Sequence, residues 1–363
     1  MRVKLGDVCE RGSSNLKQSD VVELKGNYPI YGASGYIGNL DFYHQENSYV
    51  AVVKDGAGIG RTTLLPAKSS IIGTMQYLLP KDNVLPEYLY YVVSYMHLEK
   101  YFTGATIPHI YFKDYKNEEF NLDSVDKQRK IVDVLGKCES VIESRKNELQ
   151  LLDNLIKARF VELFGDPIKN PKGWEVVTIG DIVTEVRYGT SRPAVEGGKY
   201  PYLRMNNLTS DGHLDLNDLK YIDIPDDEIE KCVVRKGDVL FNRTNSIELV
   251  GKTAVFDLPN DMIIAGYIIR VRLNERILPE VLSQYMNLEA LKDILRSMAK
   301  GAVNQANINA QELQSIKVYI PDMGTQKKFI EMKEQVDKSK VAVQKALDET
   351  QLLFDSLMQQ YFG

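Results

Sequence analysis

The stretch Leu85-Pro86-Glu87-Tyr88-Leu89 recurs 193 residues later as Leu278-Pro279-Glu280-Val281-Leu282. Three more short motifs recur in the same order, each 197 or 198 residues apart: Gly-Ala at 104–105 and 301–302, a glutamine with two cations and an apolar residue at 128–131 and 326–329, and Phe-Gly at 164–165 and 362–363. Solenoid repeats have shorter periods, of roughly 20–50 residues. The sequence therefore predicts one domain with an attached helix, present twice.

The composition is that of a soluble globular chain with two or three domains. Its 363 residues are 44% hydrophobic and 26% charged, and no apolar run approaches the roughly 18–20 residues of a membrane span. The first residues carry no signal-peptide pattern and the three cysteines are scattered, so a cytoplasmic location is expected. With a net charge of −5, binding to nucleic acid would need local basic patches or a partner that neutralises phosphates.

Each copy ends in a heptad pattern, which is typical of helices that pair with each other. In the first copy the pattern consists of Ile131, Leu135, Cys138, Ile142, Arg145, Leu149, Leu152 and Ile156. In the second copy the frame is kept by Val336, Val343, Leu347, Phe354, Leu357 and Tyr361. Packing of each helix on its own domain is the alternative, but two matched frames favour mutual pairing.

Each copy also places two cations around a predicted hairpin. Arg61 stands where a dinucleotide-binding loop needs its third glycine, so segment 54–61 is better interpreted as a hairpin that presents Lys54 and Arg61. Arg243 and Lys252 hold the same places in the second copy. Such side chains contact guanine edges or phosphates, and a solvated hairpin without a ligand is the alternative.

A polar segment precedes each predicted long helix. Segment 104–109 ends at His109, and segment 301–307 contains Asn304 and Gln305. Amide side chains bind adenine edges in the major groove, although they also cap helices and form turns. Different side chains at the same position are what two domains for different DNA sequences would carry.

Catalytic motifs are weak. Pro321-Asp322 with Glu331 and Lys333 has the loose spacing of a metal-dependent nuclease, but Glu331 and Lys333 fall on the heptad helix, which favours a chance match. Segment 170–173 is not the Asn-Pro-Pro-aromatic loop of adenine methyltransferases. The sequence therefore predicts no catalytic residue and no metal ligand.

The arrangement resembles the specificity subunit of type I restriction–modification systems over essentially the whole chain. The motifs that carry the resemblance are 28–35 (YPIYGASG), 56–60 (GAGIG), 85–89 (LPEYL), 126–131 (DKQRKI), 188–191 (YGTS), 204–208 (RMNNL) and Pro321-Asp322 before 326–328 (QKK). The first copy departs from the family pattern at 122–125 (LDSV), just before the helix.

The resemblance implies an α+β fold with two pseudo-symmetric target-recognition domains, mostly β with short helices, separated by two long antiparallel coiled-coil helices. The implied segments are 1–123 and 166–321 for the domains, and 124–165 and 322–363 for the helices. Each domain would read one half of a bipartite, gapped site in double-stranded DNA. The chain would then be a non-catalytic subunit.

The same resemblance implies the partners. Two methyltransferase subunits, which bind S-adenosylmethionine, would dock on the helices, restriction subunits would be added for cleavage, and this chain would bind no cofactor itself. The net negative charge of the chain fits partners that supply most of the contacts with phosphates. The alternatives are a fused adenine methyltransferase or nuclease, and a coiled-coil scaffold without a role on DNA.

Side-chain chemistry selects the candidate DNA contacts. In the first domain they are Lys54, Arg61, Thr74 and His109. In the second domain they are Ser191, Arg192, Arg204, Asn206, Arg243, Asn245, Lys252, Asn304 and Gln305. If Arg243 reads a base, Arg243→Ala is expected to cost about 1–3 kcal/mol of binding and to relax one position of the second half-site.

Overall fold

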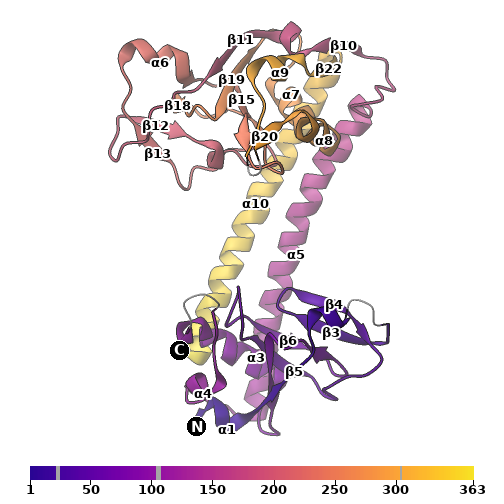
Figure 1. Ribbon diagram of the computed structural model, residues 1–363, viewed down its shortest axis with the longest axis vertical. Coiled ribbons are helices and arrows are strands. Elements are labelled where there is room, and N and C mark those ends of the chain that lie inside the picture. Colours follow the sequence, from indigo (N-terminus) through magenta and orange to yellow (C-terminus); the bar gives the residue numbers. More distant parts are fainter. Residues whose placement is uncertain (22–24, 104–107, 303–304) are drawn as a thin grey trace. The chain divides into compact units, whose positions relative to one another are not determined.

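A computed structural model describes residues 1–21, 25–103, 108–302 and 305–363 (Figure 1). The chain forms two compact units: unit 1 comprises Met1–Lys146 with Gln344–Gly363, and unit 2 comprises Asn147–Val343. Two long helices, α5 (Val125–Phe164) and α10 (Met323–Phe362), each contribute to both units. Each helix begins one residue after the start of its expected spacer segment and ends one residue before the end of that segment.

Unit 1 is built on two small sheets. The four-stranded sheet contains, in spatial order, β2 (Cys9–Ser13), β8 (Met75–Pro80), β5 (Tyr49–Val53) and β6 (Thr62–Leu65). The three-stranded sheet contains β4 (Gly35–Leu40), β3 (Tyr28–Gly32) and β7 (Ser70–Ile71), with β3 parallel to β7. All five residues of β5 are buried, as a short, continuous apolar run predicts for a strand covered on both faces.

Unit 2 repeats this order. Its first sheet contains β11 (Val183–Tyr188), β19 (Ile268–Leu273), β15 (Val239–Asn242) and β17 (Thr253–Val255). Its second sheet contains β13 (Lys220–Ile222), β12 (Tyr200–Leu203), β18 (Met262–Ile264) and β14 (Val233–Val234), with β12 parallel to β18. A further sheet contains β16 (Thr244–Asn245), β21 (Gln305–Asn307) and β20 (Lys300–Ala302).

The remaining elements are short. A two-stranded ladder closes each copy: β1 (Arg2–Lys4) with β9 (Glu119–Asn121), and β10 (Glu175–Thr178) with β22 (Lys317–Ile320). The helices of unit 1 are α1 (Leu5–Val8), α2 (Gln18–Val21), α3 (Pro86–Tyr95), η1 (Leu98–Tyr101) and α4 (Phe112–Tyr115). Those of unit 2 are η2 (Ile179–Ile182), η3 (Met205–Asn207), α6 (Asp226–Cys232), α7 (Pro279–Met286), α8 (Glu289–Met298) and α9 (Ala310–Ser315).

Backbone hydrogen bonds align the two copies residue by residue. The amide of Lys54 donates to the carbonyl of Thr74 at 3.0 Å, and the amide of Arg243 donates to the carbonyl of Tyr267 at 2.9 Å. The carbonyl of Lys54 accepts from Ile110, and that of Arg243 accepts from Ile308. Lys54 and Arg243 therefore occupy equivalent positions, and the predicted fold of two pseudo-symmetric, mostly β domains with long helices is confirmed.

The two long helices pair within each unit. In unit 1, Ile131 and Leu135 of α5 are buried in the same cluster as Met358 of α10. In unit 2, the rings of Phe160 and Phe329 lie 5.2 Å apart between centroids, at opposite ends of the two helices. Because the start of α5 meets the end of α10, and the reverse holds in unit 2, the helices are antiparallel and the predicted mutual pairing is confirmed.

The repeated glutamine explains why the Leu-Pro-Glu motif and the helix start recur together. Gln128 is fully buried; its amide nitrogen donates to the carbonyls of Asn83 and Asp123, and its oxygen accepts from the amide of Leu85, each at 2.9 Å. Gln326 makes the same three bonds, to Arg276, Pro321 and Leu278. We call these three hydrogen bonds the glutamine joint. The carbonyl of Asp123 replaces that of Pro321, so the departure from the family pattern at 122–125 leaves the glutamine joint of the first copy intact.

No helix among the residues that the structure describes combines the length and apolar character needed to cross a membrane.

Candidate nucleic-acid interface

Unit 2 contains a cavity of about 810 Å³ between the ends of its strands. Loops that follow β11, β12, β15 and β18 form its walls. Five of the predicted DNA contacts line it together: Ser191, Arg192, Arg204, Asn206 and Arg243. The sequence placed these residues in three separate segments, and the tertiary structure brings them to one site.

Two of the three arginines that line the cavity are held by carboxylates. The Nε and Nη2 atoms of Arg192 donate to the two oxygens of Glu228, at 3.0 and 2.7 Å. The Nη2 atom of Arg204 donates to Asp218 at 2.7 Å. Hydrogen bonds from Arg192 hold the pKa of Glu228 below its ordinary value. These pairs fix the side chains and compensate their charge.

Arg243 has a different environment. Its guanidinium carbon lies 4.9 Å from the centroid of the Tyr188 ring, a cation–π contact. Among the described residues, its guanidinium makes one hydrogen bond, which is long: 3.5 Å from Nη1 to the carbonyl of Gly266. Its Nε is buried and has no hydrogen-bond partner in the described part of the chain. Arg243 is therefore oriented by stacking and keeps donors for a ligand.

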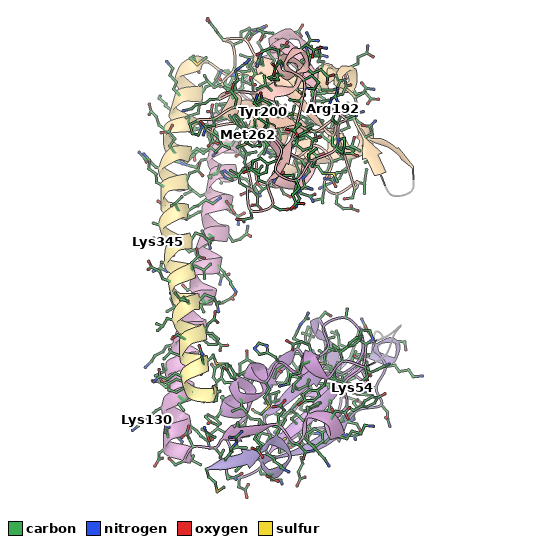
Figure 2. All side chains as sticks on the ribbon, turned by 90° about the vertical axis from the view of Figure 1, so that its left-hand side faces the viewer. Lys54, Lys130, Arg192, Tyr200, Met262 and Lys345 are labelled. Atoms are coloured by element: carbon green, nitrogen blue, oxygen red, sulfur yellow. The ribbon has the colours of Figure 1, made fainter. Side chains whose placement is uncertain are left out.

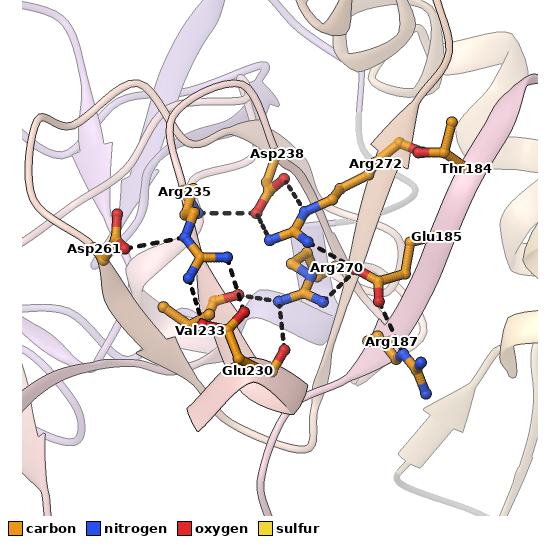
Figure 3. A network of polar contacts seen from close by, with 10 residues as sticks. All are labelled: Thr184, Glu185, Arg187, Glu230, Val233, Arg235, Asp238, Asp261, Arg270 and Arg272. Carbon is orange, nitrogen blue, oxygen red and sulfur yellow. Dashed lines mark hydrogen bonds and ion pairs between the residues drawn. The ribbon is translucent and has the colours of Figure 1, made fainter. Parts of the chain in front are cut away.

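An ion-pair network positions the wall that carries Glu228 (Figure 3). Arg270 of β19 is fully buried; it pairs with Glu185 at 2.6 Å and donates to the carbonyls of Val233 and Glu230, at the end of α6. Arg272 joins Glu185 to Asp238. The network thus connects the sheet of β11 and β19 to α6 and β14. Helix α6 carries Glu228, which holds Arg192 at the cavity.

Sequence reasoning missed three residues of the site. Tyr188 supports Arg243, and Tyr267 and Asn307 line the cavity. Tyr188 and Tyr267 are 43% and 49% exposed. An exposed aromatic at the end of a strand, as at Tyr188, or directly before a buried strand, as at Tyr267, is a signal that could have identified both. Asn307 is the equivalent of His109, since it precedes Ile308 as His109 precedes Ile110.

Unit 1 has a smaller cavity of about 590 Å³ at the equivalent place. Thr74 lines it, together with Asp55 and the turn at Ala33 and Ser34. Asp55 accepts from Lys54 at 2.6 Å and lies 2.7 Å from Nδ1 of His109. Burial alone would raise the pKa of Asp55, but these hydrogen bonds outweigh it and lower the pKa. Lys54 and His109, predicted separately, thus meet on one carboxylate.

Figure 2 labels Lys54 among the strands of unit 1, and Arg192 with Tyr200 among those of unit 2. Arg61 is exposed, and its Nη1 donates to the carbonyl of Ala33 at 3.0 Å, so it braces the turn between β3 and β4. Asn245 is half-buried and its side-chain oxygen accepts from Ser246. Asn304 and the side chain of Gln305 lie outside the described residues.

The prediction for Lys252 requires correction. Its side chain is only 7% exposed, and its ammonium donates to the carbonyls of Met205, at 2.8 Å, and Leu208. Burial lowers its pKa. The position is equivalent to Arg61, but the η3 turn folds over it and supplies acceptors for its ammonium. Lys252 therefore supports the cavity wall from inside and does not face a ligand.

Two residues of the nuclease-like spacing, Asp322 and Lys333, have structural partners. Asp322 accepts from the amide and hydroxyl of Thr325 in the first turn of α10, which is a helix cap. Lys333 pairs with Asp337 on the same helix at 2.5 Å. The described residues include no group of three or more histidine, cysteine or acidic side chains that could hold a metal ion.

Comparison with known proteins gives a family. The family model of the type I restriction modification DNA specificity domain matches residues 1–154 and 171–350. The MjaIX specificity subunit of a type I restriction enzyme from Methanocaldococcus jannaschii is 31% identical over 154 residues, which cover 36% of this chain and 35% of that protein. The EcoKI specificity subunit from Escherichia coli K12 is 27% identical over 159 residues, covering 43% and 34%. The aligned segments thus span about a third of each relative.

A solved structure is similar over the whole chain. The S subunit of a type I restriction–modification system from M. genitalium superposes with a TM-score of 0.62 and 16% sequence identity, covering 100% of this chain and 96% of that one. At this level of identity the likeness concerns the fold.

Proposed function

Because this chain belongs to the type I restriction modification DNA specificity family, we propose that it is a DNA sequence-specificity subunit. Each β-rich domain reads one half of a bipartite, gapped site in double-stranded DNA. The chain itself is non-catalytic, and methyltransferase and restriction subunits carry out the chemistry on adenine and on the DNA backbone.

One observation carries this proposal: two cavities at equivalent places of pseudo-symmetric domains have different polar linings. The cavity of unit 2 gathers Arg192, Arg204 and Arg243, whereas that of unit 1 is lined by Asp55 and Thr74. Arginine and hydroxyl or carboxylate groups recognise different base edges. Two copies of a fold with different recognition groups suit two different half-sites.

The exposed surface of the long helices supports the proposal that methyltransferase subunits dock on them. Both helices expose aliphatic side chains that the heptad stripe does not use, and exposed apolar patches often mark interaction sites. In unit 1 these are Val134, Val141, Leu352 and Leu353; in unit 2 they are Leu151, Leu155, Val161 and Val341. Lys130 and Lys345 also project from the helices into solvent (Figure 2). Partners docked here would supply the positive charge that a chain of net charge −5 lacks.

The test is base-resolution mapping of adenine methylation in the host genome, with the gene present, deleted, and replaced by a version whose segment 166–321 comes from another member of the family. We expect a gapped two-part motif that disappears on deletion and changes in one half only after the exchange. Methylation that is indifferent to the exchange would favour a scaffold without a role on DNA. Methyl transfer by the purified chain alone would favour a fused enzyme.

A further inference from the structure

We infer that Arg243 reads a guanine base in the half-site of unit 2. This inference rests on the proposed function and names the base that the larger cavity recognises. Three features of the described residues carry it: the charge balance of the cavity, the contacts that hold the guanidinium, and the donor-only chemistry of the arginines that line the cavity.

Among the residues that the structure describes, the charge balance leaves one cation of the cavity without a carboxylate partner. Arg192 is paired with Glu228 through two hydrogen bonds, and Arg204 is paired with Asp218. No described carboxylate pairs with Arg243. A phosphate-binding surface gains from several uncompensated cations, whereas a single planar cation suits the uncharged edge of a base.

The guanidinium is already oriented for an end-on contact. The cation–π contact with Tyr188 and the long hydrogen bond from Nη1 to Gly266 restrict the position of the guanidinium. Because Nε is buried, the donors left for a ligand are on Nη1 and Nη2. Two parallel donors of this kind match the O6 and N7 acceptors of guanine in the major groove, the commonest specific contact of arginine with DNA.

The arginines that line the cavity offer only donors to a ligand. Arg192, Arg204 and Arg243 line it, and a guanidinium carries five N–H donors and no acceptor. Such a lining favours a ligand edge made of acceptors. Guanine presents two acceptors in the major groove, whereas adenine presents an acceptor and a donor.

The equivalent position of unit 1 lacks this chemistry. Lys54 replaces Arg243, and its ammonium pairs with Asp55, which also contacts His109. A lysine is a point charge without a planar fork, and here its charge is compensated. The arginine-to-guanine contact is therefore confined to one half of the site, and the target is asymmetric.

The first experiment maps adenine methylation in hosts that carry the wild-type gene, Arg243→Ala, Arg243→Gln, or the matched control Arg296→Ala, whose arginine lies in an exposed ion pair on α8. We expect the wild-type motif to contain a guanine in the second half that becomes any base with Arg243→Ala and shifts toward adenine with Arg243→Gln, since glutamine pairs with adenine. The first half stays unchanged in all variants, which shows that the variants fold and assemble.

The outcomes separate two failures. If the wild-type gene produces no gapped motif, the proposed function fails. If the wild-type motif exists but Arg243→Ala retains every guanine of the second half, the guanine assignment fails alone.

A second measurement decides the case in which Arg243→Ala abolishes methylation. The wild-type chain, reconstituted with its methyltransferase subunits, is titrated with duplexes that carry 7-deazaguanine, which lacks the N7 acceptor, at one guanine at a time. We expect weaker binding at one position, by roughly 5- to 150-fold, and no further loss there in Arg243→Ala. Equal sensitivity of both proteins, insensitivity at every position, or a loss in Arg243→Ala that is uniform over all sequences would overturn the assignment, the last by making Arg243 a phosphate contact.

Discussion

Tyr77 of β8 and Arg270 of β19 occupy the same position in the two copies of one fold. Tyr77 pairs across the sheet with Ala51, which lies three residues before Lys54. Arg270 pairs with Leu240, which lies three residues before Arg243, the equivalent of Lys54. Both side chains are buried and both join two sheets. The hydroxyl of Tyr77 accepts from the amide of Ile71 at 3.0 Å, whereas the guanidinium of Arg270 donates to the carbonyl of Val233.

The difference extends to the interiors of the two units. The buried polar residues described in unit 1 are uncharged: Ser14, Ser69, Ser70, Gln76 and Gln128. Those of unit 2 include Asp238, Lys252, Arg270 and Lys292. The comparison teaches that the fold requires a bridge between its sheets but not a particular chemistry for it. Charged bridges make unit 2 more sensitive to the loss of a single side chain.

Replacement of the buried arginine should have the largest effect. Arg270→Met leaves Glu185 with its remaining arginine partners and removes the bonds to Val233 and Glu230, so we expect a loss of about 3 kcal/mol or more in the unfolding free energy. Trp174, the one tryptophan of the chain, lies in unit 2 and reports this transition by fluorescence during urea unfolding. The control Arg296→Met, in an exposed ion pair, should leave the unfolding free energy almost unchanged, because exposed ion pairs contribute little. Similar losses in both variants would contradict the special role of Arg270.

The glutamine joints should show equal effects in the two units, because their hydrogen bonds are the same. Gln128→Leu and Gln326→Leu each leave one amide and two carbonyls unpaired near the start of a long helix, with an expected cost of about 2–4 kcal/mol. Amide hydrogen exchange should show faster opening in unit 1 for the first variant and in unit 2 for the second. The exposed Gln150→Leu on α5 serves as control. A cost confined to one of the two joints would show that the copies do not share this device.

Removal of the tyrosine hydroxyl should have a smaller effect than removal of the arginine. Tyr77→Phe keeps the ring, which packs against Tyr49 with centroids 5.0 Å apart. It leaves the amide of Ile71 without its acceptor and removes the 3.2 Å contact of the hydroxyl with Nδ1 of His44. We expect a cost of about 1–2 kcal/mol, measured as faster amide exchange in β7 and β8. A cost as large as that of Arg270→Met would remove the contrast between the two bridges.

The buried Lys292 should make the stability of unit 2 depend on pH in the alkaline range. Its ammonium donates to the carbonyl of Gly251 and the side chain of Asn287, and burial lowers its pKa from 10.5 to about 8. Between these values the unfolded chain binds more protons than the folded chain, so this group makes the unfolding free energy rise with pH. The stability of the wild type relative to Lys292→Met should therefore increase from pH 7.5 to 9.5, by Trp174 fluorescence. A constant difference would show that the folded pKa is not depressed.

Local sequence determined much of this architecture. The repeated motifs identified the duplication, and the heptad frame identified two helices that pair, because helical periodicity is a property of neighbouring residues. The continuous apolar run at 49–53 marked a buried strand for the same reason. The cations Lys54 and Arg243 were also placed correctly as equivalents, since each follows such a strand.

Only the tertiary structure decided what these side chains contact. Glu228 lies 36 residues from Arg192, and Asp218 lies 14 residues from Arg204. No local sequence pattern therefore predicted that carboxylates hold these two arginines. Nor did one predict that Arg243 makes a cation–π contact with Tyr188. Lys252 shares its backbone position with the exposed Arg61, yet the η3 turn covers it. Burial and pairing depend on loops brought together from distant parts of the chain, and in this protein they separate a side chain that remains accessible at the cavity from one that holds the fold.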